Sequence, residues 1–175
     1  MKSKDNHYVV LVDKQDNEVG VAQKMAAHIN GSLHRAFSIF IFNSKGELLL
    51  QQRANSKYHS PELWTNTCCS HPYPGETLEA ATSRRLKEEM GFSCELHKAF
   101  HFIYNADVGG GLTEHEFDHV FIGYYDEAPK INEGEVMAWK WMSRDLIRKE
   151  LESQPEKYTV WFRIAFKEVE VFLNR

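Results

Sequence analysis

Cysteine is scarce in this sequence of 175 residues, and the three cysteines, Cys68, Cys69 and Cys94, are an odd number. An odd count with two neighbours excludes a disulfide framework, so we expect a reducing compartment, the cytoplasm, with thiols free for chemistry. Long apolar runs are also missing, because the longest uncharged one, residues 36–42, is too short to span a bilayer. We likewise expect no signal peptide.

Positive charge is not in excess either, since 21 Lys and Arg stand against 25 Asp and Glu, a net charge of −4. This balance argues against nucleic acid as a general partner, which requires a clustered basic surface. We expect neither a membrane nor an obligate protein partner. Repeats, low-complexity tracts and linkers are absent, so the length predicts a single domain, residues 1–175.

Short runs of apolar and β-branched residues predict strands at residues 8–12, 36–42, 47–51, 117–125 and 136–142. Residues 43–46 form the expected turn between the second and third of these strands. Apolar residues at helical spacing predict helices over residues 77–90 and 159–173. Strands dominate the middle of the chain, so the predicted fold class is α+β, or mixed α/β.

The helix predicted over residues 77–90 also carries charges that share its faces. Arg85 and Glu89 are four residues apart, as are Arg84 and Glu88. As exposed ion pairs they would contribute only a few tenths of a kcal/mol each. The alternative is a helix that presents a carboxylate to a divalent cation and a guanidinium to a phosphate.

Cys69 and His71 stand two residues apart in a loop held by two prolines and a glycine. The pair could be a nucleophile and its base, a set of metal ligands that includes the thiol, or loop packing. If residues 114–116 begin a strand, Glu114 and Glu116 project from the same face and require a counter-charge, for which a metal is the commonest choice.

His28 and His34 flank a turn signal at residues 30–31, so the chain can fold back and bring both imidazoles together. Taken singly, each histidine is better explained as a solvated or core residue. Together, the histidines, carboxylates, arginines, lysine and cysteine resemble a metal site beside an anion site.

Residues 70–91 resemble a modified Nudix box, the diphosphate signature G-x5-E-x7-R-E-U-x-E-E-x-G. Ser70 replaces the first glycine, and Arg85 replaces the glutamate after the motif arginine. In the hydrolases that glutamate helps to hold the metals that activate water, so its replacement by a cation favours binding of a diphosphate without cleavage.

From about residue 25 to residue 161, the sequence resembles the type 1 isopentenyl diphosphate isomerases. The segment Trp64-Thr65-Asn66-Thr67-Cys68-Cys69-Ser70-His71-Pro72 carries most of this resemblance. It implies a Nudix-like fold with a mixed β-sheet flanked by helices. It also implies the reversible 1,3-shift that converts isopentenyl diphosphate, a small molecule, to dimethylallyl diphosphate, without a redox cofactor.

The same resemblance assigns roles to individual residues. Cys69 and Glu116 would be the acid–base pair, Trp161 would stabilise the carbocation through its π face, and Tyr104 would assist it, orient Glu116 or relay its proton. Cys68 is interpreted as packing. Two ions are implied: Mg²⁺ on Glu89 with the diphosphate, and a second divalent metal, Mn²⁺ or Zn²⁺, on five ligands, His28, His34, His71, Glu114 and Glu116. The diphosphate-binding cations would be Lys24, Arg53, Lys57 and Arg85.

Two other functions compete with the isomerase. A Nudix-type hydrolase of nucleoside diphosphates is disfavoured by Arg85 and would leave Cys69 without a task. A metal-stabilised binding module would explain the histidines, but not the combination of Cys69, Arg85 and Trp161.

Overall fold

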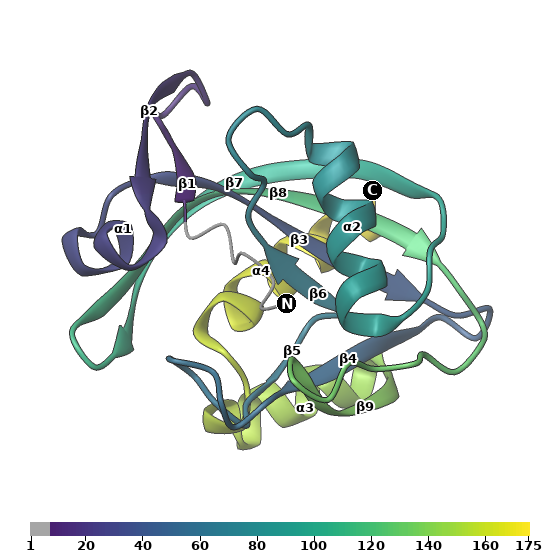
Figure 1. Cartoon of the computed structure of the whole chain (residues 1–175). Helices are drawn as coiled ribbons and strands as arrows, with labels where there is room; N and C mark the ends of the chain where they lie inside the picture. The colour runs from purple at the N-terminus through teal and green to yellow at the C-terminus, as the bar shows by residue number, and fades with distance from the viewer. Residues whose placement is uncertain (1–7) are drawn as a thin grey trace.

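The computed structural model describes residues 8–175, which form a mixed sheet with helices on both faces (Figure 1). Strand β3 lies at its centre, antiparallel to β4 and β6 and parallel to β8. Outward from these strands, β7 pairs with β8, β9 with β4, and the β1–β2 hairpin with β3. The strands of the described residues are β1 (Tyr8–Val12), β2 (Glu18–Gln23), β3 (His34–Phe42), β4 (Glu47–Arg53), β5 (Trp64–Thr65), β6 (Cys68–Ser70), β7 (Leu96–Gly109), β8 (Leu112–Tyr124) and β9 (Val136–Ser143).

Two helices cover opposite faces of the sheet, with α2 in front and α4 behind in Figure 1. Helix α2 (Leu78–Met90) buries Ala81, Leu86 and Met90 against Phe37 and Ile39 of β3. Helix α4 (Val160–Leu173) buries Phe162, Phe166 and Val169 against the other face. Burial of these apolar side chains is the main stabilising contribution. The remaining helices are α1 (Lys24–Asn30), α3 (Arg144–Ser153) and a short 3₁₀ turn (Pro155–Lys157).

The predicted strands and helices are all present, with boundaries that differ by a few residues. Thr77 and Thr159 cap α2 and α4 through their hydroxyl oxygens, and Gly91 ends α2 in the left-handed conformation. The prediction missed β2, α1, β5, β6, β7, α3 and the short 3₁₀ turn. Strand β7 alternates polar and apolar residues weakly, and pairing along β8 compensates for that weak pattern.

Strand β6 separates the two adjacent cysteines, because successive side chains point to opposite faces of a strand. Cys68 is fully buried in the cluster beneath α2, which confirms its interpretation as packing. Cys69 points to the other face, in register with Ser38 of β3. The face of β3 and β8 that carries Ser38 also carries His34, Glu116 and Asp118.

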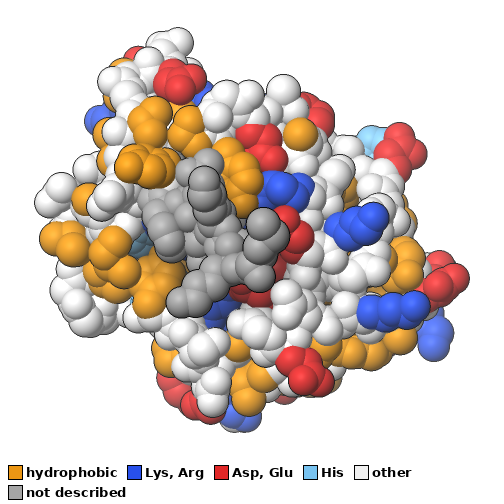
Figure 2. Space-filling model, in the orientation of Figure 1, with side chains coloured by type: hydrophobic (Ala, Val, Ile, Leu, Met, Phe, Trp, Pro, Cys, Tyr) orange, Lys and Arg blue, Asp and Glu red, His pale blue; other side chains and the backbone are white. Residues whose placement is uncertain are grey.

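The outer surface is ordinary in its mixture of charged and polar groups. Figure 2 shows hydrophobic side chains gathered over the β1–β2 hairpin and α1, where the exposed ones are Val19, Val21, Met25 and Ile29. Among residues 8–175, none of the helices has the length and apolarity needed to cross a membrane.

Candidate active site

The residues predicted as a site from separate parts of the chain come together around one cavity of about 70 Å³. Only His28 and His34 do not line it, and both lie buried against its wall beside Glu114. The predicted residues that line the cavity are Lys24, Arg53, Lys57, Cys69, His71, Arg85, Glu89, Tyr104, Glu114, Glu116 and Trp161. These residues lie on or beside β4, β6, β7 and β8 and on α1, α2 and α4, and Ser38 of β3 adds to the lining.

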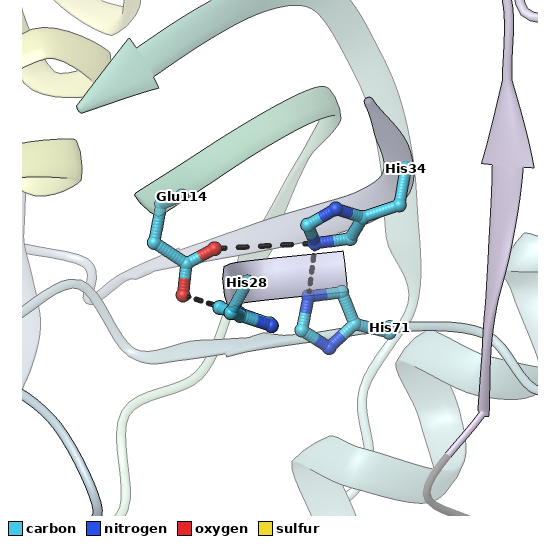
Figure 3. Close-up of side chains that lie close together, drawn as sticks. All are labelled: His28, His34, His71 and Glu114. Carbon is cyan, nitrogen blue, oxygen red and sulfur yellow. Dashed lines mark hydrogen bonds and ion pairs between the residues drawn. The ribbon is translucent and has the colours of Figure 1, made fainter. Parts of the chain in front are cut away.

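Four of the predicted metal ligands form a tight cluster, drawn in Figure 3. One donor atom from each of His28, His34, His71 and Glu114 lies within 4.8 Å of the others. The fifth predicted ligand, Glu116, adjoins them, with Oε2 3.4 Å from His71 Nε2. The turn predicted at residues 30–31 explains the approach of His28 to His34, since Gly31 has a left-handed φ of 64° and the two rings lie 5.2 Å apart.

Backbone carbonyls fix the tautomers of two of these histidines. His28 Nδ1 donates to Lys24 O at 2.6 Å, and His34 Nδ1 donates to Ser32 O at 2.8 Å. Both Nε2 atoms are therefore unprotonated in the neutral rings and turn their lone pairs towards Glu114. Glu114 Oε2 is itself buried without a hydrogen-bond partner among the described residues. This convergence of electron pairs fits a divalent cation.

Burial shifts the pKa values of this cluster. It lowers the pKa of His34 to about 4 and that of His71 well below its usual range, so both rings are neutral ligands at pH 7. Burial alone would raise the pKa of Glu114, but the adjacent imidazoles of His28 and His59 hold it well below its usual range. Burial, together with the charge of Glu114, raises the pKa of Glu116 well above its usual range.

Glu116 is held by a tyrosine from the neighbouring strand. Tyr104 is directly opposite Glu116 in the β7–β8 ladder, and its hydroxyl donates to Glu116 Oε1 at 2.6 Å. Burial raises the pKa of Tyr104 well above its usual range, so the phenol keeps its proton. The contact suits both roles considered for Tyr104, orientation and proton relay.

The thiol of Cys69 faces the cavity but does not join the histidine cluster. Its Sγ donates to Asn66 Oδ1 at 3.0 Å, and burial raises the pKa of the thiol to about 12. In the metal-free site the thiol therefore stays protonated, and its role as a metal ligand remains a prediction. Asn66 cannot rotate away, because its Nδ2 donates to Ile39 O and Cys68 O.

Trp161, at the start of α4, covers the cavity and contacts a cation of the chain itself. The Arg53 guanidinium lies 5.1 Å from the centre of the indole ring, and His59 packs edge-on against the same ring at 5.6 Å. Stacking of this kind shows that the π face of Trp161 accommodates positive charge.

Arg85 pairs with two glutamates of α2, the exposed Glu88 at 2.7 Å and the buried Glu89. Arg85 Nη2 lies 2.5 Å from Glu89 Oε1, and the other carboxylate oxygen accepts from Gln51 Nε2 at 2.9 Å. The surface interpretation, worth a few tenths of a kcal/mol, is thus wrong for this pair. Arg84 does form the predicted pair with the exposed Glu88, at 3.4 Å, and its guanidinium also binds both oxygens of Glu76 at 2.8 and 2.9 Å.

The cations of the rim extend beyond the small cavity. Lys24, Lys57 and Arg85 also line a wider groove of about 520 Å³, to which Arg84 contributes. Lys57 and Arg85 both contact Glu135, the last acidic residue before β9. Burial, together with the neighbouring charge of Lys57, lowers the pKa of the Lys24 ammonium, as expected where cations gather without enough counter-charge.

Several residues of the site escaped the prediction. Asp118 continues the spacing of Glu114 and Glu116 and accepts from Ser38 Oγ at 2.7 Å, so its period of two was a signal that went unused. Gln51 and His59 have no such pattern, and only the folded chain brings them to Glu89 and Glu114.

Comparisons with known proteins agree with this geometry. The NUDIX domain family matches residues 32–162. A protein of Photorhabdus laumondii named isopentenyl-diphosphate Delta-isomerase 2 is 56% identical over 155 residues, which is 89% of this chain and 88% of that protein. Two similarly named proteins, from Aromatoleum aromaticum and Serratia proteamaculans, are each 52% identical over 161 residues, 92% of this chain and 85% and 90% of their own lengths.

Solved structures support the fold alone, because their sequences are distant. A Deinococcus radiodurans protein superimposes with a TM-score of 0.71 at 20% identity, covering 84% of this chain and 90% of that one. The MutT protein of Methanosarcina mazei gives a TM-score of 0.67 at 21% identity, with coverages of 82% and 96%.

Proposed function

Since the chain belongs to the isopentenyl-diphosphate Delta-isomerases, a family built on the NUDIX domain, we propose that the cavity between β6, β8 and α4 is its active site. The protein is an isomerase that interconverts isopentenyl diphosphate and dimethylallyl diphosphate for isoprenoid biosynthesis. The observation that carries the assignment of the site is the meeting of Cys69, Glu116 and Trp161 around a small cavity next to converging cations.

The reaction adds a proton to the terminal alkene carbon and removes one from the carbon on the other side of the resulting tertiary cation. One group must give a proton and another must take one, and both exchange roles in the reverse direction. We assign these tasks to Cys69 and Glu116. Burial raises both pKa values in the metal-free site, so each group holds its proton more tightly there than in water. The Trp161 ring would stabilise the cation by roughly 2 kcal/mol once water is excluded.

The histidine cluster fits a divalent ion held by His28, His34, His71, Glu114 and Glu116. Five nitrogen and oxygen donors suit an octahedral ion better than a structural zinc, so Mn²⁺ is our first choice and Zn²⁺ the second. When bound, such an ion makes a ligating carboxylic acid a stronger acid. Glu89, beside the cations, would hold Mg²⁺ with the diphosphate.

Lys24, Arg53, Lys57 and Arg85 would bind the diphosphate, the guanidinium groups through paired hydrogen bonds and the ammonium groups as point charges. Arg85 stands where a Nudix hydrolase has a carboxylate, and it already pairs with Glu89. A cation at that position removes a ligand for the metals that activate water. The diphosphate is therefore bound but not cleaved.

A direct assay separates isomerisation from hydrolysis. Isopentenyl diphosphate incubated with the protein and Mg²⁺ in deuterated water should give dimethylallyl diphosphate and take up deuterium. Nucleoside diphosphates should release no phosphate under the same conditions. Phosphate release without deuterium uptake would assign the cavity to hydrolysis, and neither activity would favour a binding module.

The metal assignment has its own test. A chelator should eliminate activity, and His28→Ala, His34→Ala and His71→Ala should each lower the amount of tightly bound metal. An unchanged metal content in all three variants would contradict the site.

A further inference from the structure

His59, in the loop between β4 and β5, contacts the metal cluster without being one of its four converging donors. Its side chain is buried, and its Nε2 lies 2.8 Å from Glu114 Oε1. The same oxygen lies 2.9 Å from His28 Nε2. One carboxylate oxygen thus meets two imidazoles, while Oε2 has no hydrogen-bond partner among the described residues and lies 3.9 Å from His34 Nε2.

The two imidazoles differ in what they can offer that oxygen. His28 Nε2 carries a lone pair, because Nδ1 of that ring donates to Lys24 O. His59 Nδ1 lies 3.3 Å from the hydroxyl of Ser60, which can donate to it, so His59 Nε2 can carry the hydrogen. His59 is then the donor that fixes Glu114, and its hydrogen bond is directed at Oε1 alone.

The loop around His59 is held in a strained conformation. Ser60 and Glu62 have left-handed φ angles of 48° and 64°, which cost of order 1 kcal/mol or more each in residues other than glycine. Arg53 supports this conformation, since its Nε donates to Ser60 O and its Nη2 to His59 O, both at 3.1 Å. Strain that is supported in this way at a cavity wall indicates that the position of the imidazole matters.

We propose that His59 is a positioning residue of the metal site: its hydrogen bond to Oε1 turns the free oxygen of Glu114 towards the ion. This inference rests on the proposed metal site. Carboxylate ligands are commonly oriented by such an outer partner, and loss of the partner typically weakens metal binding by about 10–100-fold. Loss of a ligand removes the site instead, so the two roles are separable.

The test measures binding of Mn²⁺ alone, by competition with a chromophoric chelator, in wild type and four variants. His59→Phe fills the space but cannot donate, and we expect it to raise the Kd for Mn²⁺ by about 10–100-fold with one ion still bound at saturation. His59→Gln, whose amide can donate, should stay closer to wild type. His97→Phe, on an exposed histidine of β7, is the matched control and should not change Kd. His34→Ala removes a ligand and should lose the site.

Three outcomes would overturn the proposal. An unchanged Kd in His59→Phe would leave His59 without a role at the metal, and loss of the site as in His34→Ala would make it a ligand. Failure of His59→Gln to bind better than His59→Phe would reduce its role to packing. If wild type itself binds no ion, the proposed metal site fails, and the two failures remain distinct. Should His59→Phe not fold, His59→Ala gives the same comparison without added bulk.

Discussion

Replacing each of the adjacent cysteines by alanine should separate packing from chemistry. Cys68 is fully buried beneath α2 and does not line the cavity. Cys68→Ala removes one buried sulfur, and the lost transfer free energy plus the small void should cost roughly 1–2 kcal/mol. For a chain of this size, that lowers Tm by about 2–8 °C. The isomerase activity should remain close to that of wild type.

Cys69→Ala should behave in the opposite way. The thiol faces the cavity and makes one hydrogen bond, to Asn66, so its loss should cost about 1 kcal/mol or less. Removal of a group that gives or takes a proton should lower kcat by at least about 10²–10⁴-fold. The assays are formation of dimethylallyl diphosphate and a thermal melt of each variant.

If Cys69 carries the chemistry and Cys68 only packs, Cys68→Ala must lose stability but keep activity, and Cys69→Ala must lose activity but keep most of its stability. An inactive Cys68→Ala beside an active Cys69→Ala would mean that β6 presents the wrong face to the cavity. Equal losses of stability and activity in both variants would mean that the loop has only a structural role.

Three further predictions concern charge. Arg85→Ala leaves Glu89 buried with only Gln51 as a partner. The substitution should lower the free energy of unfolding, measured in a melt, by about 1–3 kcal/mol and weaken substrate binding roughly 10–100-fold. Near-normal stability and near-normal substrate binding would contradict the buried pair. Binding of Mn²⁺ should release protons, because the pKa of Glu116 is raised and a ligand must be ionised; calorimetry in two buffers measures the release, and Glu116→Gln should release fewer. In the folded, metal-free protein the pKa of His34 is about 4, against 6.5 for a free imidazole, so protonation of this residue favours the unfolded chain. As the pH falls from 6.5 to 4, the free energy of unfolding of the metal-free protein should therefore decrease by up to about 3 kcal/mol more than that of His34→Asn. Parallel pH dependences of the two free energies would refute this.

Local patterns were sufficient for the strands and helices that have strong periodicity or clear caps. Thr77 and Gly91 bound α2 because the backbone groups at helix ends need partners, and this need can be read from sequence. Strand β7 was missed because its stability comes from the ladder with β8, a long-range property. The short helix α1 has no side-chain cap, so it gave little signal.

In the site, too, local patterns predict some residues and long-range contacts determine the others. Residues that carry the resemblance to the isomerases were predicted individually, and the fold brings them to one cavity. Their supporting partners were not predicted, because contacts such as Gln51 with Glu89 join segments that only the tertiary structure brings together. The sequence also could not tell that the Arg85–Glu89 pair is buried, since helical spacing fixes which residues share a face but not what covers it.

The ladder pairings of β3 set a dimension of the site that no side chain can adjust. Cys69 lies on β6 and Glu116 on β8, the two immediate neighbours of β3. The two strands are therefore two strand spacings apart, roughly 9–10 Å, and because Cys69 pairs with Ser38 whereas Glu116 pairs with His34, the two residues are also offset by roughly 13 Å along the strands. Hydrogen-bonded spacings do not contract, so the space left for a flat hydrocarbon depends on how far each side chain reaches towards the other. Shortening Glu116 to aspartate keeps the charge and the metal-binding oxygens, yet withdraws them by one methylene that the sheet cannot recover.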